Sequence, residues 1–189
     1  MFRRKSSFGI ALAAFLIFCA APAWAAEKFL DSKDSKEADE PQKFLPDYDK
    51  LAKGKEADWV YFPSGSLKSY KTVTVKEFES NGKGREARDA AKDGKDYLEQ
   101  WLDKQGFKVV KSGGELAIEG NVFNAWEPHG AARYWGGWMA NPGVGLEVLA
   151  KDAKGNVAAE IRHKAKGSTV RDAVENGLEE IVKAFAAGK

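Results

Sequence analysis

Two stretches of the chain place apolar residues at three- and four-residue spacing, which is the pattern of a helix with one buried side. The first, residues 85–105, carries the stripe Ala87, Ala91, Gly94, Leu98, Trp101 and Leu102. The second follows Thr169 and carries Val170, Val174, Leu178, Ile181, Val182 and Phe185. Gly106 is expected to end the first helix, and Thr169, with Asp172 three residues later, is expected to cap the start of the second.

Five other segments are rich in β-branched residues or alternate apolar with polar residues, and these predict strands. They are residues 71–78, 107–110, 115–126, 144–151 and 157–164, of which the last two form a hairpin. In this hairpin, aliphatic residues alternate with the charged residues Glu147, Lys151, Glu160, Arg162 and Lys164. The alternation predicts a sheet with one buried face and one face in contact with water.

Because both helices are apolar on one side only, we expect them to cover a single face of this sheet. The predicted fold class is α+β: a two-layer sandwich with a mostly antiparallel sheet of four or five strands and two helices on one face. The sandwich forms one domain, residues 44–189. Residues 26–43 are charged and poor in apolar side chains, so they predict a flexible linker before the domain.

The first 25 residues have the three parts of a secretory signal peptide: Arg3, Arg4 and Lys5, then an apolar run, then Ala23-Trp24-Ala25. We expect cleavage after Ala25 and a periplasmic mature protein. The alternative is an envelope lipoprotein modified at Cys19. The residue before that cysteine is the bulky Phe18, where the lipoprotein peptidase needs a small residue, so we expect no lipid anchor there.

Charge and composition then exclude several classes of function. Loss of Arg3, Arg4 and Lys5 leaves 27 basic against 28 acidic residues, and this balance argues against a nucleic-acid partner. The only cysteine lies in the leader, so the mature chain has no thiol for disulfides or metal sites. The two histidines, His129 and His163, are not at metal-ligand spacing, and we expect structural roles for them. We expect no catalytic residues, metal or cofactor.

The least ordinary segment is residues 126–143, which contains three tryptophans, a tyrosine and four glycines. Aromatic rings supply a large contact area and glycines permit sharp turns, a composition suited to an interaction loop. The candidate interaction residues are Trp126, His129, Arg133, Tyr134, Trp135 and Trp138. The alternative is that these aromatic residues fold back and cover the sheet.

Residues 44–51 (FLPDYDKL), and residues 132–135 leading into 145–155, resemble the bacterial exported families grouped as domains of unknown function 3313 and 4410. The resemblance implies a small α+β domain similar to the N-terminal domain of TolB and to envelope assembly lipoproteins, with no activity to transfer. We therefore expect a non-enzymatic, envelope-associated binding or assembly module with an envelope protein as partner; membrane association stays open. The alternative is a small-ligand carrier or envelope hydrolase that uses a cleft around Trp126–Trp138, with Glu127, His129 and Arg133 as its polar groups.

Overall fold

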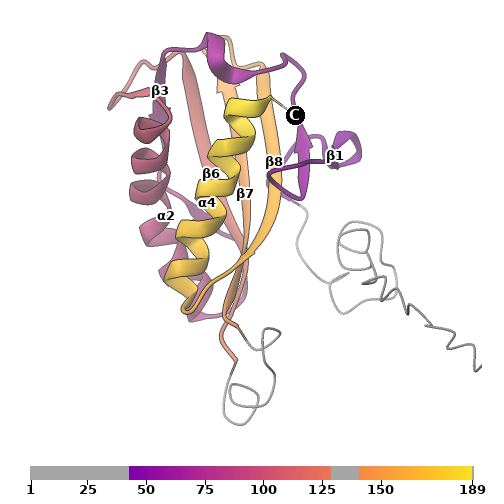
Figure 1. The fold of residues 1–189 in the computed structure, drawn as a ribbon, viewed down its shortest axis with the longest axis vertical. Helices are drawn as coiled ribbons and strands as arrows, with labels where there is room; N and C mark the ends of the chain where they lie inside the picture. The colour runs from indigo at the N-terminus through magenta and orange to yellow at the C-terminus, as the bar shows by residue number, and fades with distance from the viewer. Residues whose placement is uncertain (1–42, 129–140, 189) are drawn as a thin grey trace, which may run out of the picture.

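A computed structural model describes residues 43–128 and 141–188 (Figure 1). The elements occur in the order η1 (Tyr48–Lys50), β1 (Ala52–Lys53), β2 (Trp59–Tyr61), η2 (Leu67–Ser69), β3 (Thr72–Val75), β4 (Glu79–Ser80), α2 (Arg85–Lys104), β5 (Lys108–Val109), β6 (Leu116–Trp126), β7 (Gly143–Asp152), β8 (Val157–Lys166) and α4 (Val170–Ala187), where η marks a 3-10 helix. Neither of the described α-helices is long and apolar enough to cross a membrane.

The strands form one mixed sheet in the order β1-β2-β8-β7-β6-β3-β5, and β4 pairs with β6. Its centre is the antiparallel set β6, β7 and β8, while β3 and β4 run parallel to β6, and β5 runs parallel to β3. The predicted α+β class is confirmed. The sheet has eight strands among the described residues rather than four or five, because the additional strands are two or three residues long and leave no alternating pattern in the sequence.

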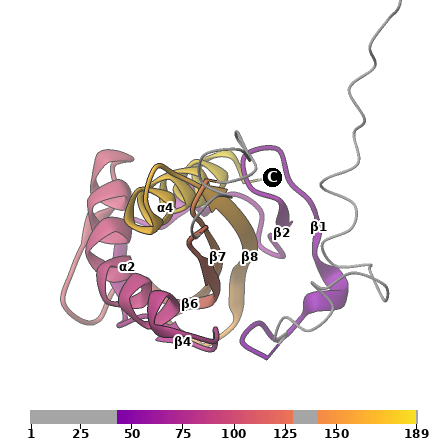
Figure 2. The ribbon, with the colours of Figure 1, turned by 90° about the horizontal axis from the view of Figure 1, so that it is seen from below.

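The two helices pack side by side on one face of the sheet, as predicted (Figure 2). Nearly all of both predicted apolar stripes is buried, and only Trp101 and Val170 keep substantial exposure. The predicted helix ends also hold. The hydroxyl of Thr169 accepts a hydrogen bond from the backbone N–H of Asp172 at 3.0 Å. Gly106, with φ of 88°, takes the left-handed conformation that ends α2.

Close packing between α2 and the sheet depends on a slot for the Phe78 ring, which lies against Gly94 of α2 and Gly120 of β6. A Cβ atom at either glycine would overlap this ring. We expect Gly120→Ala to lower the free energy of unfolding by about 1–3 kcal/mol, since overpacking displaces a core side chain. Urea unfolding followed by circular dichroism measures this. The double variant with Phe78→Leu should recover much of the loss; equal losses in the two variants would contradict the steric cause.

The sheet face away from the helices is only partly open to water, which corrects the expectation of a solvated polar face: Lys151 and Lys164 keep partial exposure, whereas the residues between them and the arm are buried. Asn121, Glu147, Glu160 and Arg162 point to that face, and none of them has any solvent exposure. The reason lies in residues 43–61, named here the N-terminal arm, which extend past β8 onto this face (Figure 2). Nothing in the local sequence of the strands signals this cover, because it comes from a segment about 100 residues away along the chain.

Candidate functional site

The candidate interaction loop is only partly visible. Trp126 is the last residue of β6, and it pairs with Gly143, the first residue of β7. Its indole ring packs so closely on Gly143 that a Cβ atom there would overlap it. His129, Arg133, Tyr134, Trp135 and Trp138 lie outside the described residues. Both ends of the aromatic segment are therefore anchored at one end of the β6–β7 hairpin, while the choice between an interaction loop and a sheet cover stays a prediction.

A cluster that the sequence did not reveal lies beneath the N-terminal arm. Its centre is the carboxylate of Glu147, which pairs with the guanidinium of Arg162 from the adjacent position of β8. The Asn121 amide donates to the same carboxylate at 2.8 Å, and the Tyr48 hydroxyl of the arm donates to it at 2.7 Å. Burial and the neighbouring negative charge of Glu147 raise the pKa of Tyr48 to about 12, so the hydroxyl keeps its proton and acts as a donor.

The guanidinium of Arg162 also lies close to two aromatic rings. Its central carbon is 3.7 Å from the centre of the Phe123 ring and 5.7 Å from that of Tyr48. Space for Phe123 exists because Gly145 of β7 has no side chain. Arginine suits this site, since its planar, weakly hydrated cation pairs with a carboxylate and stacks on rings together.

Glu160 is the second buried carboxylate of the cluster. One of its oxygens, Oε2, accepts a hydrogen bond from the backbone N–H of Asp47 in the arm at 3.1 Å. The other, Oε1, is buried and makes no hydrogen bond to any residue that the structure describes. Burial raises the pKa of this carboxyl. The cluster thus binds the arm to the sheet through the Tyr48 hydroxyl and the Asp47 backbone N–H.

A second polar set joins the arm to the helix layer. His163 of β8 contacts Asp58 of the arm through Nδ1 at 3.0 Å and Glu180 of α4 through Nε2 at 2.5 Å. Asp58 also accepts a hydrogen bond from the backbone N–H of Lys164 at 2.8 Å. Burial alone would lower the pKa of His163, but hydrogen bonds and charges from the two carboxylates outweigh it and raise the pKa to about 9. His163 is therefore protonated and structural.

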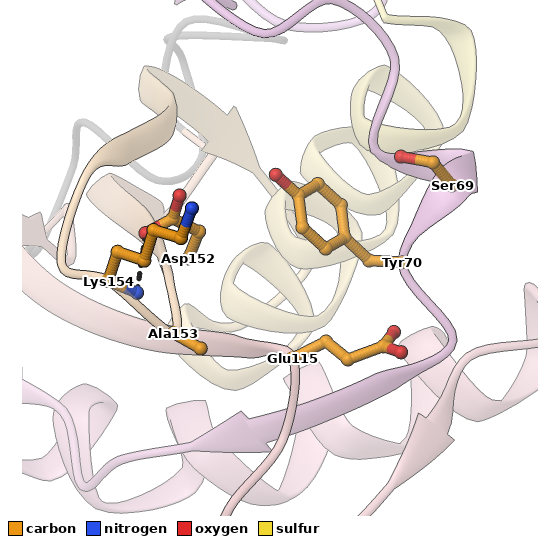
Figure 3. A pocket seen from close by; sticks show the side chains of 6 residues that line it. All are labelled: Ser69, Tyr70, Glu115, Asp152, Ala153 and Lys154. Carbon is orange, nitrogen blue, oxygen red and sulfur yellow. Dashed lines mark hydrogen bonds between the residues drawn. The ribbon is translucent and has the colours of Figure 1, made fainter.

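One surface pocket of about 420 Å³ lies at the other end of the hairpin, where β6 begins and β7 ends (Figure 3). Its lining is Ser69, Tyr70, Glu115, Asp152, Ala153 and Lys154. Backbone N–H groups of neighbouring residues already occupy both carboxylates: Thr72 donates to Glu115 and Lys154 donates to Asp152. The lining contains no histidine, and the pocket is not the cleft that the sequence suggested around Trp126–Trp138. Glu127 follows β6 directly, but its predicted companions His129 and Arg133 lie outside the described residues.

Among residues 43–128 and 141–188, no three histidine, cysteine or acidic side chains lie together in a way that could hold a metal ion. Several of the buried polar side chains, among them Glu147, Glu160 and His163, contact the N-terminal arm.

No protein-family model matches this chain, and no curated protein matches it. The solved structures that share its fold include two of a PelC dodecamer. The PelC dodecamer from Paraburkholderia phytofirmans gives a TM-score of 0.51 at 14% identity, over 69% of this chain and 98% of that one. A variant of the same PelC dodecamer gives 0.52 at 13% identity, over 69% and 96%. At these identities the likeness shows the fold alone.

Proposed function

We propose that this protein is an exported, non-enzymatic binding or assembly module of the bacterial cell envelope, and that it contacts a protein partner through the aromatic segment, residues 126–143. The observation that carries the proposal is the anchoring of this segment. Its first and last residues, Trp126 and Gly143, are paired at the end of the long β6–β7 hairpin. A segment rich in tryptophan that is held on a rigid hairpin can present several rings at little cost in entropy.

The polar cluster and the histidine set support a binding role over a catalytic one. Glu147 is engaged by Tyr48, Asn121 and Arg162, and His163 is held between two carboxylates. Groups so engaged stabilise the fold, whereas a general base or nucleophile must reach a substrate atom.

We propose a role in assembly as well. The solved PelC structures are dodecamers, and our proposal extends self-assembly to this chain. The envelope location is proposed from the leader and from the resemblance of residues 44–51 to exported families.

Affinity capture from detergent-solubilised envelope tests the proposal. The bait is the mature protein, compared with a Trp135→Ala/Trp138→Ala variant whose circular dichroism spectrum is unchanged. We expect the variant to retain at least tenfold less of a specific partner, because buried tryptophans dominate protein interfaces.

Trp101→Ala is the matched control, since Trp101 is a half-exposed tryptophan of α2 outside the segment. Equal capture by the double variant and the wild type would contradict the proposed interface. Failure of every bait to capture a partner would contradict the binding role and favour the small-ligand carrier or hydrolase.

A further inference from the structure

The surface pocket at the start of β6 has one wall made by Tyr70 and Glu115. Tyr70 lies between η2 and β3, and it packs against the hydrophobic core. The carboxylate of Glu115 is fixed through Oε2, which accepts hydrogen bonds from the backbone N–H groups of Lys71 and Thr72. These bonds lower the pKa of Glu115, so its carboxylate is ionised at neutral pH. A wall fixed in this way loses little further freedom when a ligand binds.

The turn between β7 and β8 makes another wall of the pocket. The carboxylate of Asp152 accepts hydrogen bonds from the side-chain amide of Asn156 at 2.9 Å and from the backbone N–H groups of Lys154 and Asn156 at 2.8 Å and 2.9 Å. These bonds lower the pKa of Asp152 and fix the turn. Both oxygens of Asp152 are therefore engaged within the turn, and the side chains that the turn adds to the lining are Ala153 and Lys154.

Four polar groups of the lining make no hydrogen bond or ion pair with any residue that the structure describes. They are Oε1 of Glu115, the ammonium of Lys154, and the hydroxyls of Ser69 and Tyr70. In Figure 3 the Tyr70 ring stands between Lys154 on one side and the carboxylate of Glu115 on the other. The pocket thus offers an anion and a cation on the two sides of an aromatic ring.

This arrangement is complementary to a small molecule that itself carries both charges. The ammonium of such a ligand would meet Glu115, its carboxylate would meet Lys154, and its apolar part would lie on the ring of Tyr70. The pocket volume of about 420 Å³ falls in the range of about 300–1,000 Å³ that small-molecule sites occupy. We propose that this pocket binds small zwitterions of the α-amino acid class. The site goes beyond the proposed function, since the aromatic segment lies at the other end of the β6–β7 hairpin.

Isothermal titration calorimetry with the mature protein tests the site. The probes are glycine, L-leucine and L-phenylalanine, and each is compared with its N-acetyl derivative and its methyl ester. Acetylation removes the ammonium group, and esterification removes the carboxylate. We expect both derivatives to bind at least about tenfold more weakly than the free amino acid, because each has lost a charge-assisted hydrogen bond.

Two variants assign the contacts to their side chains. Glu115→Gln keeps an amide oxygen that can accept from the backbone N–H of Thr72, so the fold should persist. It should weaken binding of the free amino acid at least about tenfold and leave binding of the N-acetyl derivative unchanged. Lys154→Met should weaken the free amino acid in the same way and leave the methyl ester unchanged. The matched control is Lys83→Met, since Lys83 is an exposed lysine in the turn before α2, outside the lining.

Absence of binding for all three probes at millimolar concentration would overturn the proposal. Equal binding of the free amino acids and their derivatives would do so as well, because the two charges would then not be recognised. Binding that neither variant weakens would place the ligand outside this pocket and would also overturn it. Capture of a protein partner through Trp135 and Trp138 is measured separately, so either proposal can fail alone.

Discussion

Replacing Arg162 with methionine is expected to lower the free energy of unfolding by about 3–5 kcal/mol, because it leaves the fully buried carboxylate of Glu147 without its cation. The neighbouring Glu160 adds a second negative charge on the same face. Methionine keeps most of the volume of the arginine stem, so the loss reports charge more than packing. Urea unfolding monitored by circular dichroism at pH 7 measures the change.

Lys164→Met is the matched control for this prediction, since Lys164 lies two residues further along β8 on the same face and is half-exposed. Substitutions at such surface positions change stability by roughly 0.5 kcal/mol. Combining Arg162→Met with Glu147→Leu removes the charge as well as the cation, and should recover most of the loss. A loss below about 1 kcal/mol for Arg162→Met alone would mean that the pair does not support the arm.

The second large effect is a pH dependence that His163 creates. Its pKa is about 9 in the folded protein against 6.5 for an ordinary histidine, and a raised folded-state pKa stabilises the protonated form. The contribution is complete below pH 6.5, falls as pH rises from 6.5 to 9, and is absent above. This pKa difference sets an upper limit of about 3 kcal/mol on the free energy of unfolding lost over that interval. The actual loss should be smaller, because Asp58 and Glu180 keep some contact with water.

Chemical denaturation at a series of pH values from 6 to 9.5 tests this expectation. His163→Asn should be less stable than the wild type at pH 6 and should have a much flatter pH profile. His129→Asn, which changes the other histidine, should keep the wild-type profile. A wild-type stability that rises between pH 6.5 and 9 would contradict the protonated state assigned to His163.

The two helices were predicted correctly from the local spacing of apolar residues. The stripes from Ala87 to Leu102 and from Val174 to Phe185 are buried as their spacing predicts, because a helix that must bury apolar area can turn only one side to the sheet. The long strands β6, β7 and β8 were also predicted, because their residues alternate between the two faces of the sheet. The strands β1 and β4 escaped prediction, since two residues carry no period, whereas β5 was predicted within residues 107–110.

The polar face of the sheet is where prediction from local sequence failed. Alternation along β7 and β8 correctly places Glu147 and Arg162 on the side away from the helices, and it wrongly predicts water there. Which groups meet on that face depends on Tyr48 and Asp47, and on the path the chain takes between the arm and β8. Neither residue has a spacing that links it to Glu147 or Glu160, so the cluster could not be found from the sequence.

By itself, the sequence determined the α+β class, the two helix faces, the antiparallel hairpin and the aromatic character of residues 126–143. These features depend on periods of two and 3.6 residues, on caps and on composition, all of which act between near neighbours. Only the tertiary structure decided that the centre of the charged face is buried, that the arm closes over it, and that His163 joins three elements. Those outcomes depend mainly on contacts between residues about 100 positions apart. At that distance along the chain, ion pairing and the loss of contact with water decide where each charged group lies, and local propensity does not.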